Sequence, residues 1–174
     1  EITAATTIEW TQEELDNMDD VRSLDKTVTL RFPVNGTKRL NQTTVVFEEM
    51  IHQGVMVSYH ADLGDEGQSV HHPEIRTTVR DSETGDEVGA NREDITIIDT
   101  VYYYNLIPGM HYEISGTLMD AETGEPYLDD NGEEVTAVCE DLVVEAGGEN
   151  GSVELTFTFK GTNLEGRSTV VFEE

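Results

Sequence analysis

Positive charge is scarce in this sequence: its 174 residues include 10 Lys and Arg against 37 Asp and Glu, a formal net charge of −27. A protein that binds nucleic acid or an anionic membrane surface neutralises phosphates with clustered Lys and Arg. Here the three lysines and seven arginines are scattered along the chain. The composition therefore argues against nucleic acid and membranes as partners, and its excess of acid favours a soluble, monomeric surface.

Disulfides, membrane spans and targeting signals are also missing from the sequence. The single cysteine, Cys139, cannot form an internal disulfide, and cysteine usage leaves the compartment open. No apolar run approaches the ~20 residues of a membrane-spanning helix, and no signal peptide opens the chain. Because the sequence begins at Glu1 and leads directly into strand-like residues, we interpret it as a segment of a longer protein.

The apolar residues that are present alternate with polar ones in short runs. These runs are rich in Val, Thr and aromatic residues and are separated by Gly, Asn and Asp clusters, a pattern typical of β-strands joined by turns. We therefore predict an all-β fold of sandwich modules. The exception is Thr11-Gln-Glu-Glu14, whose capping-box pattern predicts a short helix near residues 12–20. Strands are expected at 27–32, 43–50, 55–59, 75–79, 95–104, 111–118, 135–138, 153–159 and 169–172.

An internal repeat organises the chain. The sequence QTTVVFEE at 42–49 recurs as RSTVVFEE at 167–174, 125 residues later. With the residues upstream included, 1–49 repeats 134–174. The chain thus opens inside one repeat and stops inside the next.

The predicted domains follow from this repeat, with their junction at Pro73. Residues 1–70, the first repeat, are the C-terminal half of one β-sandwich truncated at its N-terminus. Residues 73–174, the second repeat, are most of another sandwich that lacks its last strand. Repeats of one β module in an acidic, cysteine-poor chain favour a stalk over an enzyme with a pocket, because stalk modules contact chiefly their neighbours.

The loop at residues 60–70 is acidic enough to suggest a metal site. Its candidate ligands are His60, Asp62, Asp65 and Glu66. Calcium loops place ligands at alternate positions around a mid-loop glycine, and this loop does not reproduce that spacing. A solvated acidic loop is the simpler interpretation, so we expect no metal and no other cofactor.

Thr77 is a candidate nucleophile on its strand. The two-residue period places Thr77 on one face with Ile75 and Val79, so that its hydroxyl points to the core. A buried threonine that is only hydrogen-bonded is the alternative interpretation.

Three carboxylates continue apolar strand faces. Asp99 shares its face with Ile95 and Ile97, where a charge is costly unless it is paired. Desolvation there raises a carboxyl pKa toward acid–base use. Glu173, and Glu48 in the other repeat, also continue apolar strand faces, so their carboxyl pKa values could be raised in the same way. The alternatives are an aspartate that leaves the sheet at a strand end and glutamates that are solvated at a sheet edge.

Long motifs in a fixed order resemble a known family. The runs PEIRTTV, IIDTVYYYNLIPG, VELTFTF and TVVFEE, with the loop HADLGDEGQSV, resemble the T-Q ester-bond domain. That domain also occurs in VaFE-type repeat proteins and builds surface adhesins of Gram-positive bacteria. The resemblance covers nearly all of residues 26–174 and leaves 1–25 unassigned. It implies an Ig-like β-sandwich in which a first-strand Thr is joined to a last-strand Gln by an ester, formed without an enzyme and with loss of ammonia.

The resemblance also divides the candidate residues into two half-sites. His60 lies eight residues before Gln68, a spacing similar to the family's His and Gln pair. A hydroxyl is a poor nucleophile and a primary amide a poor electrophile, so the reaction needs a base and an acid, and a nearby histidine can be both in turn. Taken alone, His60 is an ordinary surface histidine. The first half-site is Glu48, His60 and Gln68, and the second half-site is Thr77, Asp99 and Glu173.

Each half-site lacks its other half, so no ordinary complete ester site is expected in this chain. Two exceptions are conceivable. In one, residues 51–70 fold back as the missing strand of the second repeat, as in a circular permutation. In the other, strands are exchanged between chains.

The sequence therefore favours a structural role over an enzymatic one. We expect a stalk segment of an adhesin anchored to the cell wall of a Gram-positive bacterium, outside the cell, with single-turnover autocatalytic cross-linking only. Its expected partners are neighbouring repeats of the same chain and, through other domains, a host-surface ligand.

Three other functions are alternatives to the stalk. A ligand-binding sandwich for carbohydrate or host protein has Trp10, Tyr127 and residues 102–104 as its only aromatic candidates. An isopeptide module needs a lysine that heads a strand opposite an acid, and none of the three lysines does so. A hydrolase needs a nucleophile-elbow or metal motif, and the sequence has neither.

Overall fold

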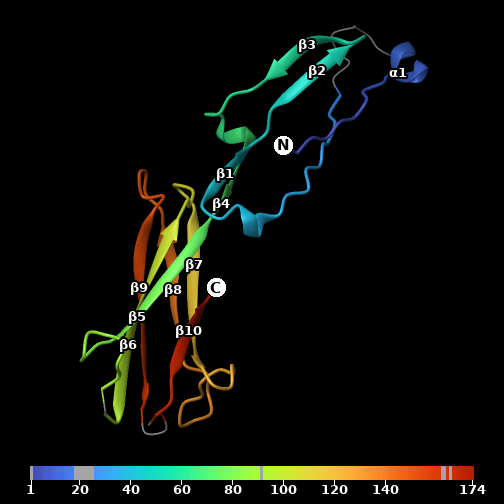
Figure 1. The fold of residues 1–174 in the computed structure, drawn as a ribbon. Coiled ribbons are helices and arrows are strands. Elements are labelled where there is room, and N and C mark those ends of the chain that lie inside the picture. Colours follow the sequence, from blue (N-terminus) through green and yellow to red (C-terminus); the bar gives the residue numbers. More distant parts are fainter. Residues whose placement is uncertain (1, 18–25, 91, 162–163, 165) are drawn as a thin grey trace. The chain divides into compact units, whose positions relative to one another are not determined.

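The protein, a computed structural model, is described over residues 2–17, 26–90, 92–161, 164 and 166–174. Its chain divides into two compact units, Glu1–Lys38 and Arg39–Glu174. The described residues form ten β-strands, one short α-helix and two 3-10 turns, which confirms the all-β fold (Figure 1). None of the described helices has the length and apolar character needed to cross a membrane.

The unit Glu1–Lys38 contains the predicted helix but no strand among its described residues. Helix α1 spans Gln12–Asp16, and its capping box is formed: the Glu14 amide donates to Thr11 Oγ1 at 3.2 Å, and the Thr11 amide donates to Glu14 Oε2 at 2.6 Å. The predicted residues 18–20 lie outside the described part. The strand expected at 27–32 is wrong, because no described strand of this unit is available to pair with it.

Residues 74–173 form a β-sandwich of two three-stranded antiparallel sheets. One sheet has the order β5-β6-β9 and the other β10-β7-β8. The strands are β5 (Glu74–Asp81), β6 (Asp94–Tyr104), β7 (His111–Asp120), β8 (Thr136–Val143), β9 (Gly151–Lys160) and β10 (Thr169–Glu173).

The core of the sandwich lies between the two sheets. Alternate residues of the strands point inward, as the two-residue period predicts, and burying each large apolar side chain contributes ~1.5–3 kcal/mol. The buried cluster consists of Ile97, Val101, Ile114, Leu118, Tyr127, Val135, Leu155, Phe157, Phe159 and Val171.

Residues 42–72 form two small two-stranded sheets outside this core. Strands β1 (Gln42–Val45) and β4 (Ser69–His72) pair antiparallel, as do β2 (Glu48–His52) and β3 (Val55–His60). The run expected at 43–50 is thus two strands, and β4 ends directly before the predicted junction at Pro73. The turn between β2 and β3 places Gln53 and Gly54 at positive φ, 50° and 78°, as a tight hairpin requires.

Only Pro73 separates β4 from β5, so that β4 leads directly into the sandwich (Figure 1). Because β4 pairs with β1, residues 51–70 do not fold back onto the second repeat. The circular-permutation exception is therefore not the arrangement that the structure shows.

Asn105, in the loop after β6, joins the β1–β4 pair to the sandwich. Its Nδ2 donates to the Gln42 carbonyl oxygen at 2.8 Å, and its Oδ1 lies 3.3 Å from Thr43 Oγ1 and 2.9 Å from His71 Nδ1. Its own amide donates to Asn150 Oδ1 at 3.0 Å. The Asn105 side chain thus links β1 to β4, and its main-chain amide links them to the loop that contains Asn150.

We expect Asn105→Gly to loosen this junction. Asn105 has a φ of 60°, which glycine adopts without strain, so the substitution isolates the loss of side-chain hydrogen bonds. Losing about 1 kcal/mol of hydrogen bonding makes the β1 and β4 amides exchange with solvent roughly fivefold faster. Hydrogen exchange followed by mass spectrometry measures this, and unchanged exchange in β1 and β4 would refute the role.

Candidate functional site

Asp99 lies in the middle of β6 and is the only fully buried carboxylate among the described residues. Its neighbours in register are Val79 on β5 and Leu155 on β9. The side chain is 0% exposed, and neither carboxylate oxygen accepts a hydrogen bond of ordinary geometry. Removing an ionised carboxylate from water into such surroundings costs on the order of several kcal/mol of hydration free energy. Sequence periodicity placed Asp99 on this face, and the alternative of a strand-end aspartate does not apply.

Thr77 and Glu173 approach Asp99 from two different sheets. Thr77, half-buried, lies on β5 and shares the inward face with Asp99, while its neighbour Thr78 is exposed. Glu173 ends β10 of the opposite sheet and pairs with Gly116. The Thr77 hydroxyl and the Glu173 carboxyl both lie against Asp99, close enough to influence its pKa. The second half-site is thus assembled across the core.

Gly116 allows the two sheets to close at this point. A Cβ atom on Gly116 would lie 2.8 Å from Phe157 Cζ, closer than real Cβ atoms approach, and 3.1 Å from Leu155 Cδ1, which would have to shift. A larger residue would push β10, and Glu173 with it, away from the opposite sheet.

Burial dominates the electrostatics of this half-site. Desolvation raises the pKa of Asp99, and hydrogen bonding with Glu173 and Thr77 offsets this rise only in part. Desolvation, followed by hydrogen bonding with Asp99 and the charge of Asp99, raises the pKa of Glu173 to about 7. The two carboxyl groups therefore titrate as a pair that retains a proton near neutral pH. Such a pair offers both an acid and a base beside the Thr77 hydroxyl.

The first half-site assembles on the β2–β3 hairpin and the loop that follows it. Glu48 and His60 are opposite each other in the β2–β3 register. Gln68 Nε2 donates to Glu48 Oε2 at 2.5 Å, while Gln68 Oε1 is buried with no partner. His60 Nε2 lies 3.2 Å from Asp65 Oδ2. The three predicted residues therefore gather in one place.

Asp65 is a residue whose part in this half-site the sequence did not reveal. Its carboxylate contacts His60 and also accepts from the Gly67 amide at 2.8 Å, which begins the turn that carries Gln68. Its position between His60 and Gln68 in the sequence could have indicated this role. From the sequence, Asp65 is considered only as a metal ligand.

The two half-sites of this chain do not meet. Gln68 ends the 3-10 turn Glu66–Gln68, and Thr77 follows nine residues later on β5, with β4 and Pro73 between them. At ~3.3 Å per residue an extended stretch of this length spans about 30 Å. The structure therefore brings Thr77 to Asp99 and Glu173, and Gln68 to Glu48, but not Gln68 to Thr77.

The candidates for other functions differ in their exposure: Trp10 and Tyr102 are 40% and 39% exposed, whereas Tyr127 is buried. Among the described residues, no three His, Cys, Asp or Glu side chains gather closely enough to hold a metal ion. Tyr127, an aromatic candidate for ligand binding, is only 7% exposed, stacks edge-on against Phe159 and donates to the Lys160 carbonyl oxygen at 2.8 Å. Most of its ring therefore packs in the core.

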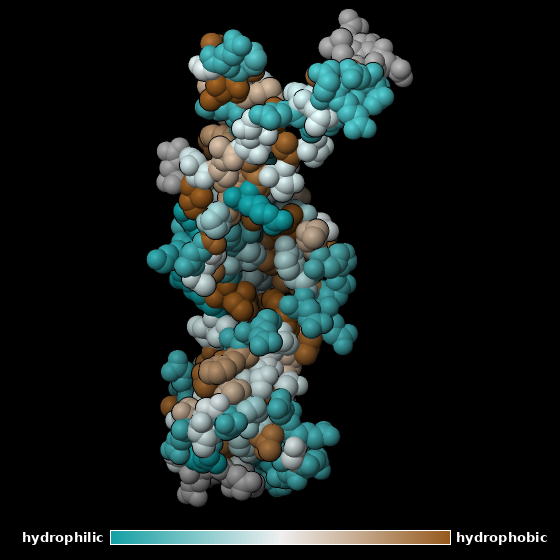
Figure 2. Space-filling model, turned by 90° about the vertical axis from the view of Figure 1, so that its right-hand side faces the viewer, coloured by the Kyte–Doolittle hydropathy of each residue, from teal (hydrophilic) through white to brown (hydrophobic). Residues whose placement is uncertain are grey.

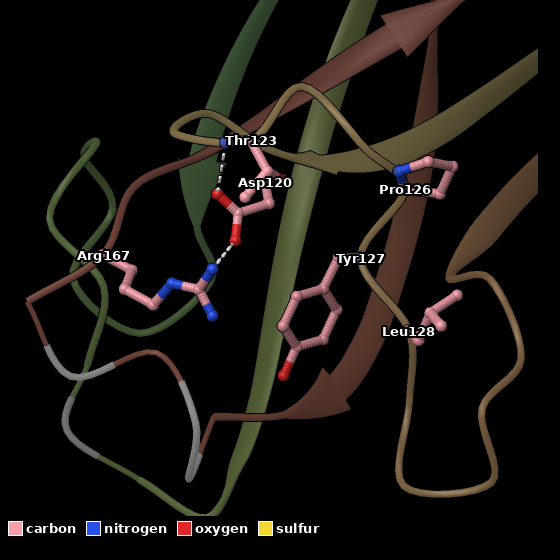
Figure 3. Close-up of a pocket in the computed structure, with 6 residues that line it drawn as sticks. All are labelled: Asp120, Thr123, Pro126, Tyr127, Leu128 and Arg167. Atoms are coloured by element: carbon pink, nitrogen blue, oxygen red, sulfur yellow. Dashed lines mark hydrogen bonds and ion pairs between the residues drawn. The ribbon is translucent and has the colours of Figure 1, made fainter.

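In a surface hollow beside Tyr127, the charged side chains are paired with groups of the protein itself. Arg167 closes one side by an ion pair with Asp120, whose other oxygen accepts from the Thr123 amide (Figure 3). These charges are thus satisfied within the protein, and the hollow contains none of the predicted site residues. It is lined by Asp120, Thr123, Pro126, Tyr127, Leu128 and Arg167.

Fold and site together define a β-sandwich module in which a buried aspartate and a half-buried glutamate lie beside a strand hydroxyl. The family model of the T-Q ester bond containing domain matches residues 2–72 and, again, residues 73–174. The chain therefore belongs to the family of T-Q ester bond containing domains.

Two solved structures of a bacterial adhesin from Mobiluncus mulieris, which contains intramolecular disulfide, isopeptide and ester bond cross-links, are similar to this chain. They are 22% and 21% identical to it, with TM-scores of 0.45 and 0.44. In both comparisons 59% of this chain is covered, and it spans 43% of the adhesin chain. A comparison with curated proteins gives no match.

Proposed function

We propose that this chain is a structural stalk segment of a bacterial surface adhesin, whose repeats are each locked by an autocatalytic Thr–Gln ester. Family membership supports an ester-bond module. The observation that carries the proposal is a glutamate position common to both half-sites. Glu173 lies against Thr77 and Asp99, whereas Glu48, its counterpart in the repeat, accepts from Gln68. A complete repeat then holds Thr, Asp, Glu, His and Gln around one glutamate.

The orphaned polar atoms of the two half-sites complement each other. Gln68 Oε1 is a buried acceptor without a donor, and the Asp99–Glu173 pair retains a proton without a fully satisfied acceptor. Buried polar groups are costly until they are paired. In a complete repeat the protonated acid donates to the glutamine carbonyl oxygen, which satisfies both and polarises the amide toward attack.

The reaction balances without any cofactor. The threonine Oγ1 attacks the glutamine Cδ, a new C–O bond forms, and the C–N bond to Nε2 breaks. The hydroxyl proton passes through the carboxylate or the histidine to the leaving nitrogen, which departs as ammonia. Both Thr and Gln are consumed, so each site turns over once and the protein is not an enzyme.

An ester between the first and last strands serves a mechanical role. Force applied to the two ends of a module is carried by the covalent bond rather than by the hydrogen bonds of the sheet. By analogy with a disulfide, the cross-link also restricts the unfolded chain, which stabilises the fold by ~2–4 kcal/mol. This suits repeats 1–70 and 73–174 as successive links of an extracellular, wall-anchored stalk that presents a host-binding domain elsewhere in the protein.

Adding the missing strands of the second repeat tests the proposal. Glu174 corresponds to Glu49, so a copy of residues 50–72 placed after Glu174 restores the order of the first repeat. We expect this extended chain to lose about 17 Da, the mass of one ammonia, in intact mass spectrometry. Thr77→Ala abolishes the loss, and Thr78→Ala, an exposed neighbour on the same strand, preserves it. An extended chain that folds at its full mass would overturn the ester.

A further inference from the structure

Asp65 lies between His60 and Gln68 in the chain and contacts the surroundings of both. Its Oδ2 lies 3.2 Å from His60 Nε2, and its Oδ1 accepts from the Gly67 amide at 2.8 Å. Its carbonyl oxygen accepts from the Gln68 amide at 3.0 Å and from the Ser69 hydroxyl at 3.0 Å. One residue therefore links the histidine to the turn that carries the glutamine.

Asp62 makes the same kind of local turn without a contact to the histidine. Its Oδ1 accepts from the Gly64 amide at 2.8 Å, and each aspartate thus bonds to a glycine two residues later. Aspartate favours turns of this kind, so the turn explains one oxygen of Asp65. The other oxygen lies at His60, for which it makes the only ion-pair contact among the described residues.

The His60 ring is exposed to solvent over 59% of its side chain. Hydrophilic and apolar residues are intermixed on the surface of the molecule, as Figure 2 shows for one face. An exposed neutral imidazole can carry its proton on either nitrogen and can rotate, so a general base of this type needs a neighbour that fixes it. A carboxylate beside Nε2 favours the proton on that nitrogen and leaves the lone pair on Nδ1.

We propose that Asp65 is a positioning residue of the ester-forming reaction: its carboxylate holds the His60 ring with Nε2 protonated and Nδ1 as the base, while its turn presents the Gln68 amide. This inference rests on the proposed function. In a complete repeat the threonine Oγ1 proton passes to the histidine Nδ1 as the C–O bond to the glutamine Cδ forms. The same proton then passes to the glutamine nitrogen, the C–N bond breaks, and ammonia leaves.

The carboxylate has a second effect during this sequence of proton transfers. Between the two transfers His60 is an imidazolium, and the negative charge of Asp65 beside Nε2 stabilises it. An aspartate has this effect on the histidine of Ser-His-Asp hydrolases, where it also fixes the tautomer. Asp65 itself keeps its charge throughout and exchanges no proton.

Asp65→Asn separates the contact with the histidine from the turn. Asparagine keeps an Oδ1 that accepts from the Gly67 amide, but it replaces the oxygen beside His60 with an NH2 group, which donates. The histidine Nε2 must then accept, so the neutral ring carries its proton on Nδ1 and loses the proposed base. Asp62→Asn is the matched control, because it makes the same change in the neighbouring turn.

Nitrogen NMR of this chain at alkaline pH, where imidazole is neutral, reports which ring nitrogen of His60 carries the proton. We expect Nε2 to be protonated in the wild type and in Asp62→Asn, and Nδ1 to be protonated in Asp65→Asn. His52, an exposed histidine of the same hairpin, is the internal reference and is expected not to change. One and the same tautomer of His60 in all three chains overturns the positioning role.

The rate of ester formation in the extended chain tests the chemical consequence. The substitutions are made in the appended copy of residues 50–72, which supplies the glutamine for Thr77. We expect Asp65→Asn to slow the loss of ammonia by roughly 10²-fold, a usual contribution of general acid–base catalysis. Asp62→Asn is expected to leave the rate unchanged. Intact mass spectrometry at intervals after dilution from urea measures these rates.

The outcomes separate this inference from the function on which it rests. If Asp65→Asn reacts as fast as the parent extended chain, the positioning role is wrong and the ester function stands. A slow variant whose His60 keeps the wild-type tautomer also overturns the role, because only the turn is then needed. If the parent extended chain folds and keeps its full mass, the ester function itself is overturned, and the role of Asp65 in it as well.

Discussion

Replacing Asp99 with Val is expected to raise the free energy of unfolding of this chain at neutral pH by about 1–3 kcal/mol, because neither carboxylate oxygen has a hydrogen-bond partner of ordinary geometry and the substitution removes the cost of burying an unpaired polar group. Asp99 is fully buried between Val79 and Leu155, and its oxygens have no ordinary hydrogen-bond partner. Valine has a similar volume and suits the surrounding core. Urea unfolding followed by circular dichroism measures the change, which corresponds to about 2–4 °C in Tm per kcal/mol.

Asp81→Val is the matched control, and we expect the opposite sign. Asp81 is only 3% exposed, yet its carboxylate accepts from the amides of Glu83, Thr84 and Ala90 at 2.8, 3.0 and 3.1 Å. Desolvation alone would raise the pKa of Asp81, but these donors outweigh it and lower the pKa. Removing the acceptor orphans three amides, so the free energy of unfolding falls by about 1–3 kcal/mol.

Comparing Asp99→Val with Asp81→Val shows whether the Asp99 carboxyl stabilises the fold or serves the ester-forming reaction. In the extended chain, Asp99→Val is expected to prevent ester formation while it stabilises the fold, a trade-off typical of reactive sites. If Asp99→Val destabilises the protein as Asp81→Val does, then the Asp99 carboxyl makes stabilising interactions and the interpretation of a strained buried acid is wrong.

The stability of the chain is expected to fall as pH rises from about 4.5 to about 7. The pKa of Glu173 is raised from 4.5 to about 7 in the fold by desolvation first, and then by Asp99. An acid with a higher pKa in the folded state binds more protons there than in the unfolded chain. Its contribution to stability is therefore complete below pH 4.5 and lost as pH rises through the folded pKa. After allowance for partial solvent screening, we expect a loss of about 1–3 kcal/mol.

Comparing the single variants Glu173→Gln and Glu48→Gln isolates the contribution of Glu173 to the pH dependence of stability. The net charge of −27 also makes high pH unfavourable through self-repulsion, so a charge-matched control is needed. Glu48 is the exposed counterpart of Glu173 in the repeat, and Glu48→Gln removes the same charge without touching the buried pair. Urea midpoints between pH 4 and pH 8 are expected to flatten for Glu173→Gln only. Equal slopes in both variants would show that the pair does not hold the proton.

Local alternation predicted most of the second repeat. Four predicted strands are present in the structure as β5, β6, β7 and β9; they were expected at 75–79, 95–104, 111–118 and 153–159. Each buries one face, so its apolar and polar residues alternate along the sequence. The same period placed Asp99 on an apolar face and Thr77 on the inward side of its strand. The side chains that matter most to the half-site were thus identifiable without coordinates.

The predictions failed where the structure depends on pairing or packing between residues that are distant in the sequence. The run at 27–32 has the pattern of β9, but it has no described strand to pair with and forms none. The sequence indicated a strand that ends before Pro73, but only the ladder of β4 with β1 shows which strand it pairs with. Tyr127 looked like an exposed aromatic of a loop, and its burial follows from packing against Phe159 on a strand that is distant in sequence.

The self-similarity of the sequence by itself identified two repeats, and the strand period placed Thr77 and Asp99 on inward faces; both are local properties. The resemblance to the T-Q ester-bond domain, not the period, predicted that one repeat contributes Glu48, His60 and Gln68 and the other Thr77, Asp99 and Glu173. The tertiary structure decided that Glu173 crosses the core to Asp99, where Gly116 lets the two sheets approach, and that β4 pairs with β1 instead of folding back. Both depend on which strands and sheets meet, and contacts between residues far apart in the chain are set by the packing of the whole fold.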